Sequence, residues 1–310
     1  MAPLPSSGPI SLQMIYDEFV SKRTNGNGYE LDDYRGSIYW LTDYPYTQGS
    51  FSTSGNLNIS EFYGKRATDP VVPGSINYDS GSGAISTPVY RQYVKIEAWG
   101  GGGGGGPAIY GWDSGRAEHP KNNGTNGGTT SISLTHIGGS TSMTSTGGVG
   151  GSFGFRRGPN NGSGGANGTG SISSAIANKT TSSGVGGGAG NAGSGNRSSG
   201  GAGGRAGSPG GAGGAPGSNG AGNGNPGGAP GGGGGGGGFS DQKKKDPNCA
   251  GGGGRGGAGY SRVTFTRSNL APGTRITYSV GAAGIGRPGS SGTGSSGNGG
   301  TGRFKITWDL

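Results

Sequence analysis

The sequence predicts a mainly β and irregular protein, in which a small N-terminal module with short helices precedes a β-sandwich that frames a bundle of packed polyglycine II helices. Three observations support this fold class. Glycine accounts for 83 of the 310 residues, against an average usage of roughly 7%. Only 10 of these glycines lie in residues 1–90. In the rest of the chain, segments with alternating apolar residues bracket the glycine runs, and this alternation is typical of β-strands.

The change in glycine content predicts three parts of the chain: a module at residues 1–66, a linker at 67–90 and a glycine-rich domain at 91–310. Hydrophobic residues make up only 27% of the chain, which is too little for a large apolar core. Charged residues are also scarce, at 13%, where disordered segments are usually rich in charge. We therefore expect the glycine-rich domain to fold through backbone bonding more than through apolar burial.

Short helix and turn signals mark the N-terminal module. Ser11 can cap a short helix, and apolar residues follow it at helical spacing at positions 12, 15 and 19. One short pattern then occurs twice, as Leu-Asp-Asp-Tyr-Arg-Gly at 31–36 and as Ile-Ser-Glu-Phe-Tyr-Gly at 59–64. Each copy has an aliphatic residue, a polar and an acidic residue, two large side chains and a glycine.

Six segments of the remaining chain have the two-residue period of antiparallel strands. They are Tyr93 to Trp99, the segments around Ile132 and Leu134 and around Val263 and Phe265, Ile276 to Val280, Phe304 to Trp308, and the weaker Thr141 to Thr146. Most of the glycine lies between these strands and not after them. A disordered tail would not be bracketed in this way, so we expect the glycine region to fold.

The spacing of the glycines indicates an extended helix. Gly100–Gly106 and Gly231–Gly238 are uninterrupted, and the spacing between Gly201 and Gly220 is mostly three. Three residues per turn is the period of the left-handed polyproline II type of helix, which has no internal hydrogen bonds. Its amides must therefore bond to neighbouring segments or to water.

Collagen has the same period but requires one unbroken triplet register and abundant proline. Here the register slips at Pro216, Asn223 and Pro230. We therefore expect short antiparallel polyglycine helices packed side by side. Ordering a glycine backbone costs roughly 1–2 kcal/mol per residue. We expect the strands to offset part of this cost, because they hold both ends of each glycine segment.

Four pieces of the glycine-rich domain resemble those of a known class of protein. They are Val-Lys-Ile-Glu-Ala-Trp-Gly at 94–100, the run at 231–238, the segment 270–281, and Gly-Arg-Phe-Lys-Ile-Thr-Trp at 302–308. Together they resemble the glycine-rich domains of bacteriophage tail-fibre proteins and are similar in style to the fibre-tip adhesins of T-even-type phages. The resemblance covers roughly residues 91–310. Residues 9–12 and 59–64 resemble short modules of phage structural proteins and differ from the attachment domain of those adhesins.

The resemblance implies a virion protein, made in the host cytoplasm, that is a tail-fibre or baseplate-associated adhesin recognising a host surface receptor. In those adhesins polyglycine helices form a sandwich whose variable loops contact the host. Residues 1–66 would then bind other virion proteins, and the loops would bind a host surface glycan, lipopolysaccharide or an outer-membrane protein. The alternative is a purely structural virion component, such as a baseplate, collar or fibre connector, without receptor binding.

Three segments between the glycine runs combine aromatic and cationic side chains, which can stack on sugars and bind phosphate or carboxylate groups. If successive polyglycine helices run up and down, these segments gather at one end. The predicted receptor-binding residues are Tyr110, Trp112, Asp113, Arg116, His119, Phe153, Phe155, Arg156, Arg157, Phe239, Lys243, Lys244 and Lys245. The alternative interpretation is that the aromatics anchor the loops and the charges keep the surface soluble.

Enzymatic chemistry is not indicated. The two histidines, His119 and His136, have no nucleophile paired with them, and the glycine strings that match dinucleotide fingerprints do not open a helix. With one cysteine, Cys249, and two distant histidines we expect no metal site and no cofactor. No apolar run approaches the roughly 20 residues of a membrane span.

Net charge leaves other binding functions to consider. Residues 1–90 hold 5 Lys or Arg and 9 Asp or Glu, so the remaining 220 residues hold 19 and 6, a net charge of +13. This charge favours anionic partners. The arginines are too scattered for an Arg-Gly-rich nucleic-acid binder, so we expect no nucleic-acid partner. An ice-binding polyglycine bundle would need a flat, ordered face, which the sequence does not reveal.

Overall fold

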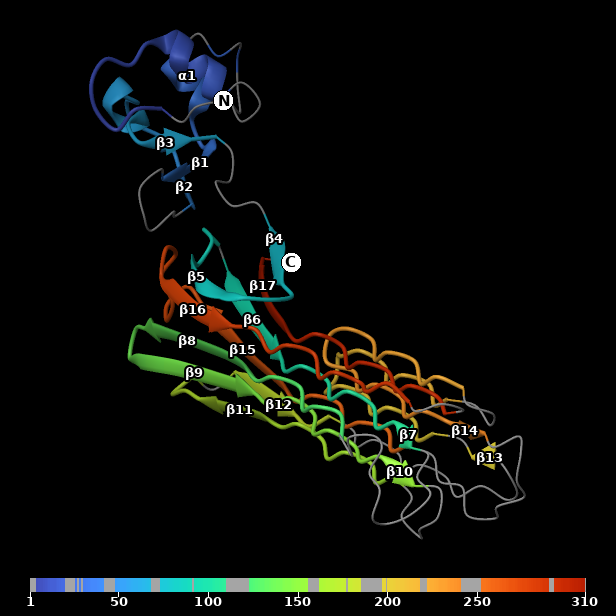
Figure 1. The fold of residues 1–310 in the computed structure, drawn as a ribbon. Helices are drawn as coiled ribbons and strands as arrows, with labels where there is room; N and C mark the ends of the chain where they lie inside the picture. Colours follow the sequence, from blue (N-terminus) through green and yellow to red (C-terminus); the bar gives the residue numbers. More distant parts are fainter. Residues whose placement is uncertain are drawn as a thin grey trace. The chain divides into compact units, whose positions relative to one another are not determined.

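A computed structural model divides the chain into two compact units (Figure 1). The first comprises residues 1–73 and 89–91, and the second comprises residues 74–88 and 92–310. The expected linker, 67–90, therefore lies partly within the second unit. The structure describes residues 4–19, 26, 28, 30–41, 48–67, 73–90, 92–109, 123–155, 162–176, 178–184, 197–198, 200–217, 222–240, 252–289 and 293–309.

The architecture is mainly β, as the sequence predicts. Among the described residues one segment is α-helical, α1 (Leu12–Phe19) in the first unit. The Oγ atom of Ser11 accepts a hydrogen bond from the N–H of Met14 at 3.2 Å, which is the expected cap. Ile15 and Phe19 are fully buried, whereas Leu12 is 39% exposed. Two of the three predicted apolar residues of the helix therefore face the core.

The repeated sequence pattern forms two similar turns, the 3-10 helices η1 (Leu31–Tyr34) and η2 (Ile59–Phe62). In each turn the acidic residue, Asp33 or Glu61, accepts the N–H of the residue that precedes the turn. This arrangement is a capping box. The aromatic residue of each turn is buried, and the closing glycine has a positive φ, 69° in one copy and 64° in the other.

These turns supply the core of the first unit. Its sheet has the order β2-β1-β3, formed by β1 (Ile38–Leu41), β2 (Gln48–Ser50) and β3 (Lys65–Arg66). Phe62 packs against Tyr34 and Phe19, with ring centroids 5.6 and 5.9 Å apart in edge-to-face geometry. Phe51 completes the cluster. The aromatic residues of this cluster thus come from the helix, both turns and the residue after β2.

The second unit contains two five-stranded sheets in which all neighbouring strands are antiparallel. In order across the first sheet, the strands are β12 (Lys179–Ser182), β15 (Tyr260–Thr266), β6 (Tyr93–Trp99), β17 (Arg303–Trp308) and β4 (Gly74–Tyr78). In order across the second sheet, they are β11 (Gly170–Ser173), β9 (Gly139–Ser145), β8 (Thr130–His136), β16 (Arg275–Ser279) and β5 (Ser82–Ser86).

All six predicted strands are present, as β6, β8, β9, β15, β16 and β17, and Val280 lies one residue beyond its strand. The alternation in the sequence did not predict β4, β5, β11 and β12, which all lie at sheet edges. Their sequences contain few large apolar residues, because an edge strand contributes little to the core. The strands β4 and β5 lie within the expected linker, so that linker is shorter than predicted.

The apolar sides of the two sheets contact each other. The Oγ of Ser145 on β9 donates to the carbonyl of Ala98 on β6 at 3.0 Å and lies 2.7 Å from the Oγ of Ser261 on β15. The rings of Tyr278 and Phe304 are 5.0 Å apart between the sheets. Apolar residues of β6, β8, β15 and β17 are buried on these sides.

The glycine segments continue from the strands and are hydrogen-bonded to one another. Backbone N–H groups of residues 100, 103 and 106 donate to carbonyls of residues 259, 256 and 253. Those of residues 101 and 104 donate to 128 and 125, and those of 102 and 105 donate to 300 and 297. Successive amides of Gly100–Gly106 therefore point to three different segments in rotation, and each segment receives every third bond.

The same run also accepts bonds from three further segments. Its carbonyls at residues 101, 102 and 103 accept the N–H groups of Gly148, Gly284 and Gly234. The run is buried along its whole length, and so are residues 231–238 and 252–259. Around them, residues are buried at every third position, for example at 148, 151 and 154. Three central glycine segments are thus enclosed by other segments of the same chain.

Side chains are excluded from the central segments by backbone atoms. A Cβ at Gly102 would overlap the carbonyl of Gly232, and a Cβ at Gly236 would overlap the carbonyl of Gly252. Both carbonyls belong to buried segments of the bonded network. They cannot move away without breaking further bonds, so these positions require glycine for close approach.

We predict that Gly236→Ala lowers the free energy of unfolding by about 3 kcal/mol or more, because overpacking against fixed backbone is strongly unfavourable. Ala212→Ser, at an exposed position in a neighbouring glycine segment, should change it by no more than about 0.5 kcal/mol. Urea unfolding followed by circular dichroism measures both. Equal midpoints for the two variants would contradict the packing argument.

Candidate functional site

The candidate site lies at one end of the glycine segments, away from the sheets of the same unit (Figure 1). There β7 (Ala108–Ile109) pairs in parallel with β10 (Gly154–Phe155), and β13 (Arg197–Ser198) pairs with β14 (Phe239–Ser240). We call this end of the second unit, defined by these two strand pairs, the distal end. Ten of the thirteen predicted receptor-binding residues lie in segments 110–122, 156–161 and 241–251, which adjoin described residues of the distal end in the sequence.

Hydrogen bonds connect the bases of these three segments. The N–H of Gly237 donates to the carbonyl of Gly106 at 3.1 Å, and the N–H of Gly106 donates to Gly253 at 3.0 Å. Gly252 in turn donates to Gly237, and Gly253 donates to Ser152, both at 3.0 Å. The residues before the first segment, before the second, and on both sides of the third are therefore neighbours.

Most of the predicted receptor-binding side chains lie outside the described residues. These are Tyr110, Trp112, Asp113, Arg116, His119, Arg156, Arg157, Lys243, Lys244 and Lys245. Phe155 and Phe239 are placed as strand positions of β10 and β14. Phe153 is half-buried, and its N–H donates to the Oδ1 of Asn123 at 3.3 Å, which links the base of the second segment to the end of the first.

The described part of the chain contains no group of three or more His, Cys, Asp or Glu residues that could hold a metal ion. It also contains no helix long and apolar enough to cross a membrane. His136 is buried at the end of β8, where its Nδ1 lies 2.9 Å from the carbonyl of Ile137 and its ring packs on Phe265 at 5.5 Å. These contacts indicate a structural role for His136 at the end of β8.

A buried polar pair lies on the other side of β6 and β15. The hydroxyl of Tyr260 donates to the Oε1 of Glu97 at 2.7 Å, and the ring of Tyr260 packs on Trp99 with centroids 4.9 Å apart. Burial, and then the bond to Glu97, raise the pKa of the Tyr260 hydroxyl. The neutral phenol therefore satisfies the buried carboxylate, and the pair stabilises the point where the strands continue into glycine segments.

A second surface was not found from the sequence. The outward side of the sheet β11-β9-β8-β16-β5 offers fourteen side-chain positions, and all but Ala84 and Arg275 are Ser or Thr. These twelve residues, here called the hydroxyl face, are Ser82, Ser86, Ser131, Ser133, Thr135, Ser140, Ser142, Thr144, Ser171, Ser173, Thr277 and Ser279. The signal was present as the polar half of the alternation, for example in Ser-Ile-Ser-Leu-Thr at 131–135.

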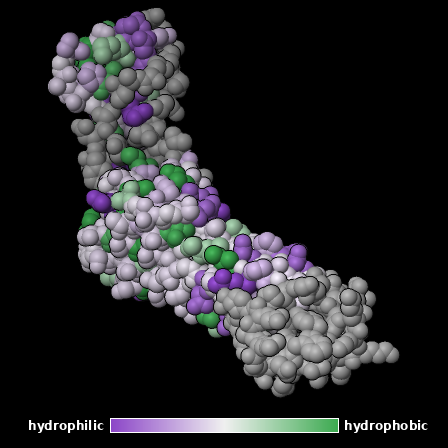
Figure 2. All heavy atoms as spheres, in the orientation of Figure 1, coloured by the Kyte–Doolittle hydropathy of each residue, from purple (hydrophilic) through white to green (hydrophobic). Residues whose placement is uncertain are grey.

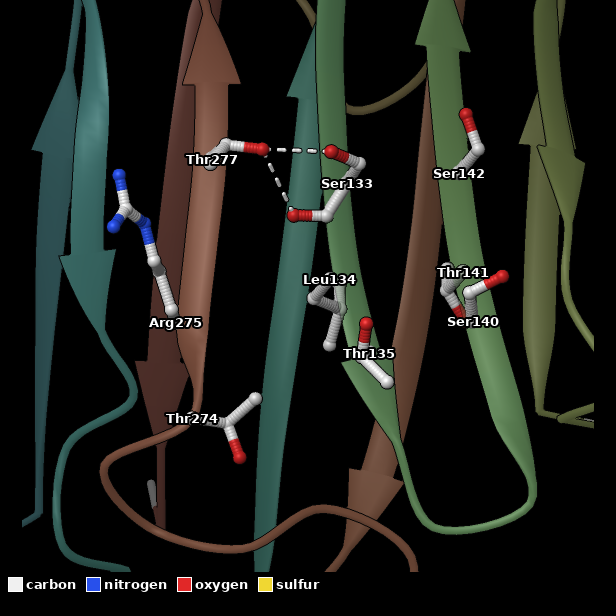
Figure 3. A pocket seen from close by; sticks show the side chains of 9 residues that line it. All are labelled: Ser133, Leu134, Thr135, Ser140, Thr141, Ser142, Thr274, Arg275 and Thr277. Carbon is white, nitrogen blue, oxygen red and sulfur yellow. Dashed lines mark hydrogen bonds between the residues drawn. The ribbon is translucent and has the colours of Figure 1, made fainter.

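The strand register arranges these hydroxyls in rows across the sheet. Ser173, Ser142, Ser133 and Thr277 are successive partners on four neighbouring strands. The Oγ1 of Thr277 lies 2.6 Å from the Oγ of Ser133, as Figure 3 shows, and a shallow hollow of about 390 Å³ surrounds this pair. Arg275 borders the hollow and is its one charged side chain. Figure 2 shows that much of the visible surface of the second unit is neither strongly hydrophilic nor strongly hydrophobic.

Comparisons with known protein families, with curated proteins and with solved structures give no match to this chain. Function is therefore inferred from the residues of the chain itself. Two parts of the structure are relevant: the distal end, where the described residues beside the three segments are neighbours, and the hydroxyl face.

Proposed function

We propose that the chain is a bacteriophage virion protein, a tail-fibre or baseplate-associated adhesin that recognises a host surface receptor at the distal end. The observation that carries the proposal is the hydrogen-bonded adjacency of the bases of segments 110–122, 156–161 and 241–251. These segments are far apart in the sequence, yet the described residues beside them are neighbours. Such an arrangement suits a composite binding surface carried by a scaffold.

The scaffold is proposed to be a β-sandwich continued by packed polyglycine II helices. Two features support this architecture: the rotation of the amides of Gly100–Gly106 among three neighbours, and burial at every third residue. Both follow from three residues per turn. A strand rises about 3.3 Å per residue and a polyproline II helix about 3.1 Å. With these rises, the path from Tyr93 along β6 and on to Ile109 is roughly 50 Å long. The proposed scaffold separates the distal end from the strand ends near Gly74, where the second unit begins.

The chemistry of the three segments suits a bacterial surface. They contain seven Lys or Arg and four Asp or Glu, and Tyr110 and Trp112 supply aromatic rings. Cations bind phosphate and carboxylate groups, and rings stack on sugars. Lipopolysaccharide and surface glycans present both. The first unit is proposed to bind other virion proteins, and no catalytic step, cofactor, nucleic acid or membrane insertion is part of the proposal.

We predict that the purified chain binds lipopolysaccharide or intact cells of the phage's host, and that Trp112→Ala lowers the affinity at least tenfold by removing an aromatic contact. Val149→Ala is the matched control, because Val149 is an exposed apolar residue of the same unit outside the three segments. Cell pull-down and surface plasmon resonance measure both. The adhesin proposal is contradicted if the wild-type chain binds no host surface, or if both variants bind equally.

The alternative, a structural virion component without a ligand, makes a different prediction about position. An adhesin should be labelled on intact particles at a distal site by an antibody against segment 110–122, and the same antibody should block adsorption of the phage. A connector, collar or internal baseplate protein should be labelled only on opened particles, without an effect on adsorption. Immunogold electron microscopy with an adsorption assay separates the two.

One observation favours a second candidate function, ice binding. The hydroxyl face is a regular array with spacings of about 4.8 Å between strands and about 6.8 Å along them, and ordered water can bridge such hydroxyls.

If this function holds, the wild-type chain inhibits ice recrystallisation and Ser142→Lys abolishes the inhibition. Thr181→Lys, exposed on β12 of the other sheet, should have no effect. No inhibition by the wild-type chain would exclude ice binding and leave the adhesin proposal untouched.

A further inference from the structure

A single charged residue interrupts the buried glycine segment 252–259. Arg255 has no exposed surface and is the largest of the fully buried side chains. Its backbone is part of the network, because its N–H donates to Gly234 at 3.2 Å and its carbonyl accepts the N–H of Gly204. The side chain is therefore held within the bundle and cannot leave it without disturbing both neighbouring segments.

The guanidinium group of Arg255 has no hydrogen-bond partner among the described residues. All three of its nitrogen atoms, Nε, Nη1 and Nη2, are buried and unsatisfied. An unpaired buried charge costs several kcal/mol, and buried charges in proteins are normally paired or bind an ion. Among the described arginines, Arg255 is the one whose three side-chain nitrogen atoms are all buried and unsatisfied.

Two glycines provide the space in which this guanidinium lies. A Cβ at Gly124 would lie 2.5 Å from Nη2, and a Cβ at Gly150 would overlap Nη1. These glycines belong to two different segments, and both lie beside the guanidinium. The cradle is lined by backbone and by the side chain of Asn126, whose Oδ1 accepts the N–H of Gly150 at 2.7 Å. No described carboxylate forms an ion pair with Arg255.

A second cation increases the excess of positive charge. Arg287 is close enough to act on Arg255 electrostatically, and its Nε donates to the carbonyl of Asn123 at 3.3 Å. Burial, and then the charge of Arg287, lower the pKa of Arg255 from 12.5 to about 9. Because arginine keeps its proton in proteins, neutralisation requires a counter-charge.

We propose that Arg255 and Arg287 bind one small inorganic anion between the glycine segments, beside the base of segment 110–122. A monatomic anion such as chloride fits this site best, because Arg255 has no exposed surface and the surrounding walls are mainly backbone. The anion accepts hydrogen bonds from the guanidinium and stabilises the bundle where the proposed binding segments begin. This site does not depend on the adhesin proposal, since it is a property of the folded scaffold.

The test is thermal unfolding of the full chain at constant ionic strength, with sodium chloride replacing sodium gluconate, whose anion is too large to enter. We expect the Tm of the wild-type chain to rise saturably by roughly 5 °C, and sulfate to give a smaller rise. Arg255→Met should remove the saturable response and Arg287→Met should weaken it. Arg275→Met, at an exposed arginine of the hydroxyl face sheet, should respond like the wild type.

A direct measurement covers the case in which Arg255→Met does not fold. Crystals of the wild-type chain grown in sodium bromide should show an anomalous peak within hydrogen-bond distance of the Arg255 guanidinium. The proposal is overturned if no peak is found there, or if chloride and gluconate give the wild-type chain the same Tm. A larger Tm rise with sulfate or phosphate than with chloride would overturn the assignment of a monatomic anion.

Discussion

Backbone hydrogen bonding between glycine segments is the interaction on which the second unit depends. In Gly100–Gly106 each amide donates to one of three neighbouring segments, and carbonyls accept from three others. A net contribution of about 1 kcal/mol per bond is comparable with the cost of ordering a residue. The bonds form only where backbones approach closely, as the overlap of a Cβ at Gly102 with the Gly232 carbonyl illustrates. The bonded network therefore requires residues without side chains at these close approaches. The two sheets hold the glycine segments in register.

The parts of the fold that could be predicted are those with a local periodic signal. The alternation in 93–99 and 304–308 located two strands in the middle of the first sheet, β6 and β17, and the repeated pattern at 31–36 and 59–64 marked two equivalent turns. The triplet spacing also indicated segments that must bond to neighbours. In each case the residues that carry the signal are the residues that make the contacts.

The rest could not be predicted because it depends on contacts between distant segments. The short strands β4 and β5 have few large apolar residues of their own and pair with β17 and β16. Arg255 has the local sequence of an exposed charge in a glycine linker, and only the segments around it determine its burial. For the candidate site, the sequence supplied the aromatic and cationic residues, and the structure supplied the adjacency of their anchoring backbones.

The rotation of donors in the glycine segments limits how this chain can vary. Because successive amides of Gly100–Gly106 bond to three neighbouring segments in rotation, one inserted residue would bring every following amide to the wrong neighbour. An insertion of three residues would restore all directions and only lengthen the segment. Insertions and deletions within the bonded glycine segments are therefore expected in multiples of three residues.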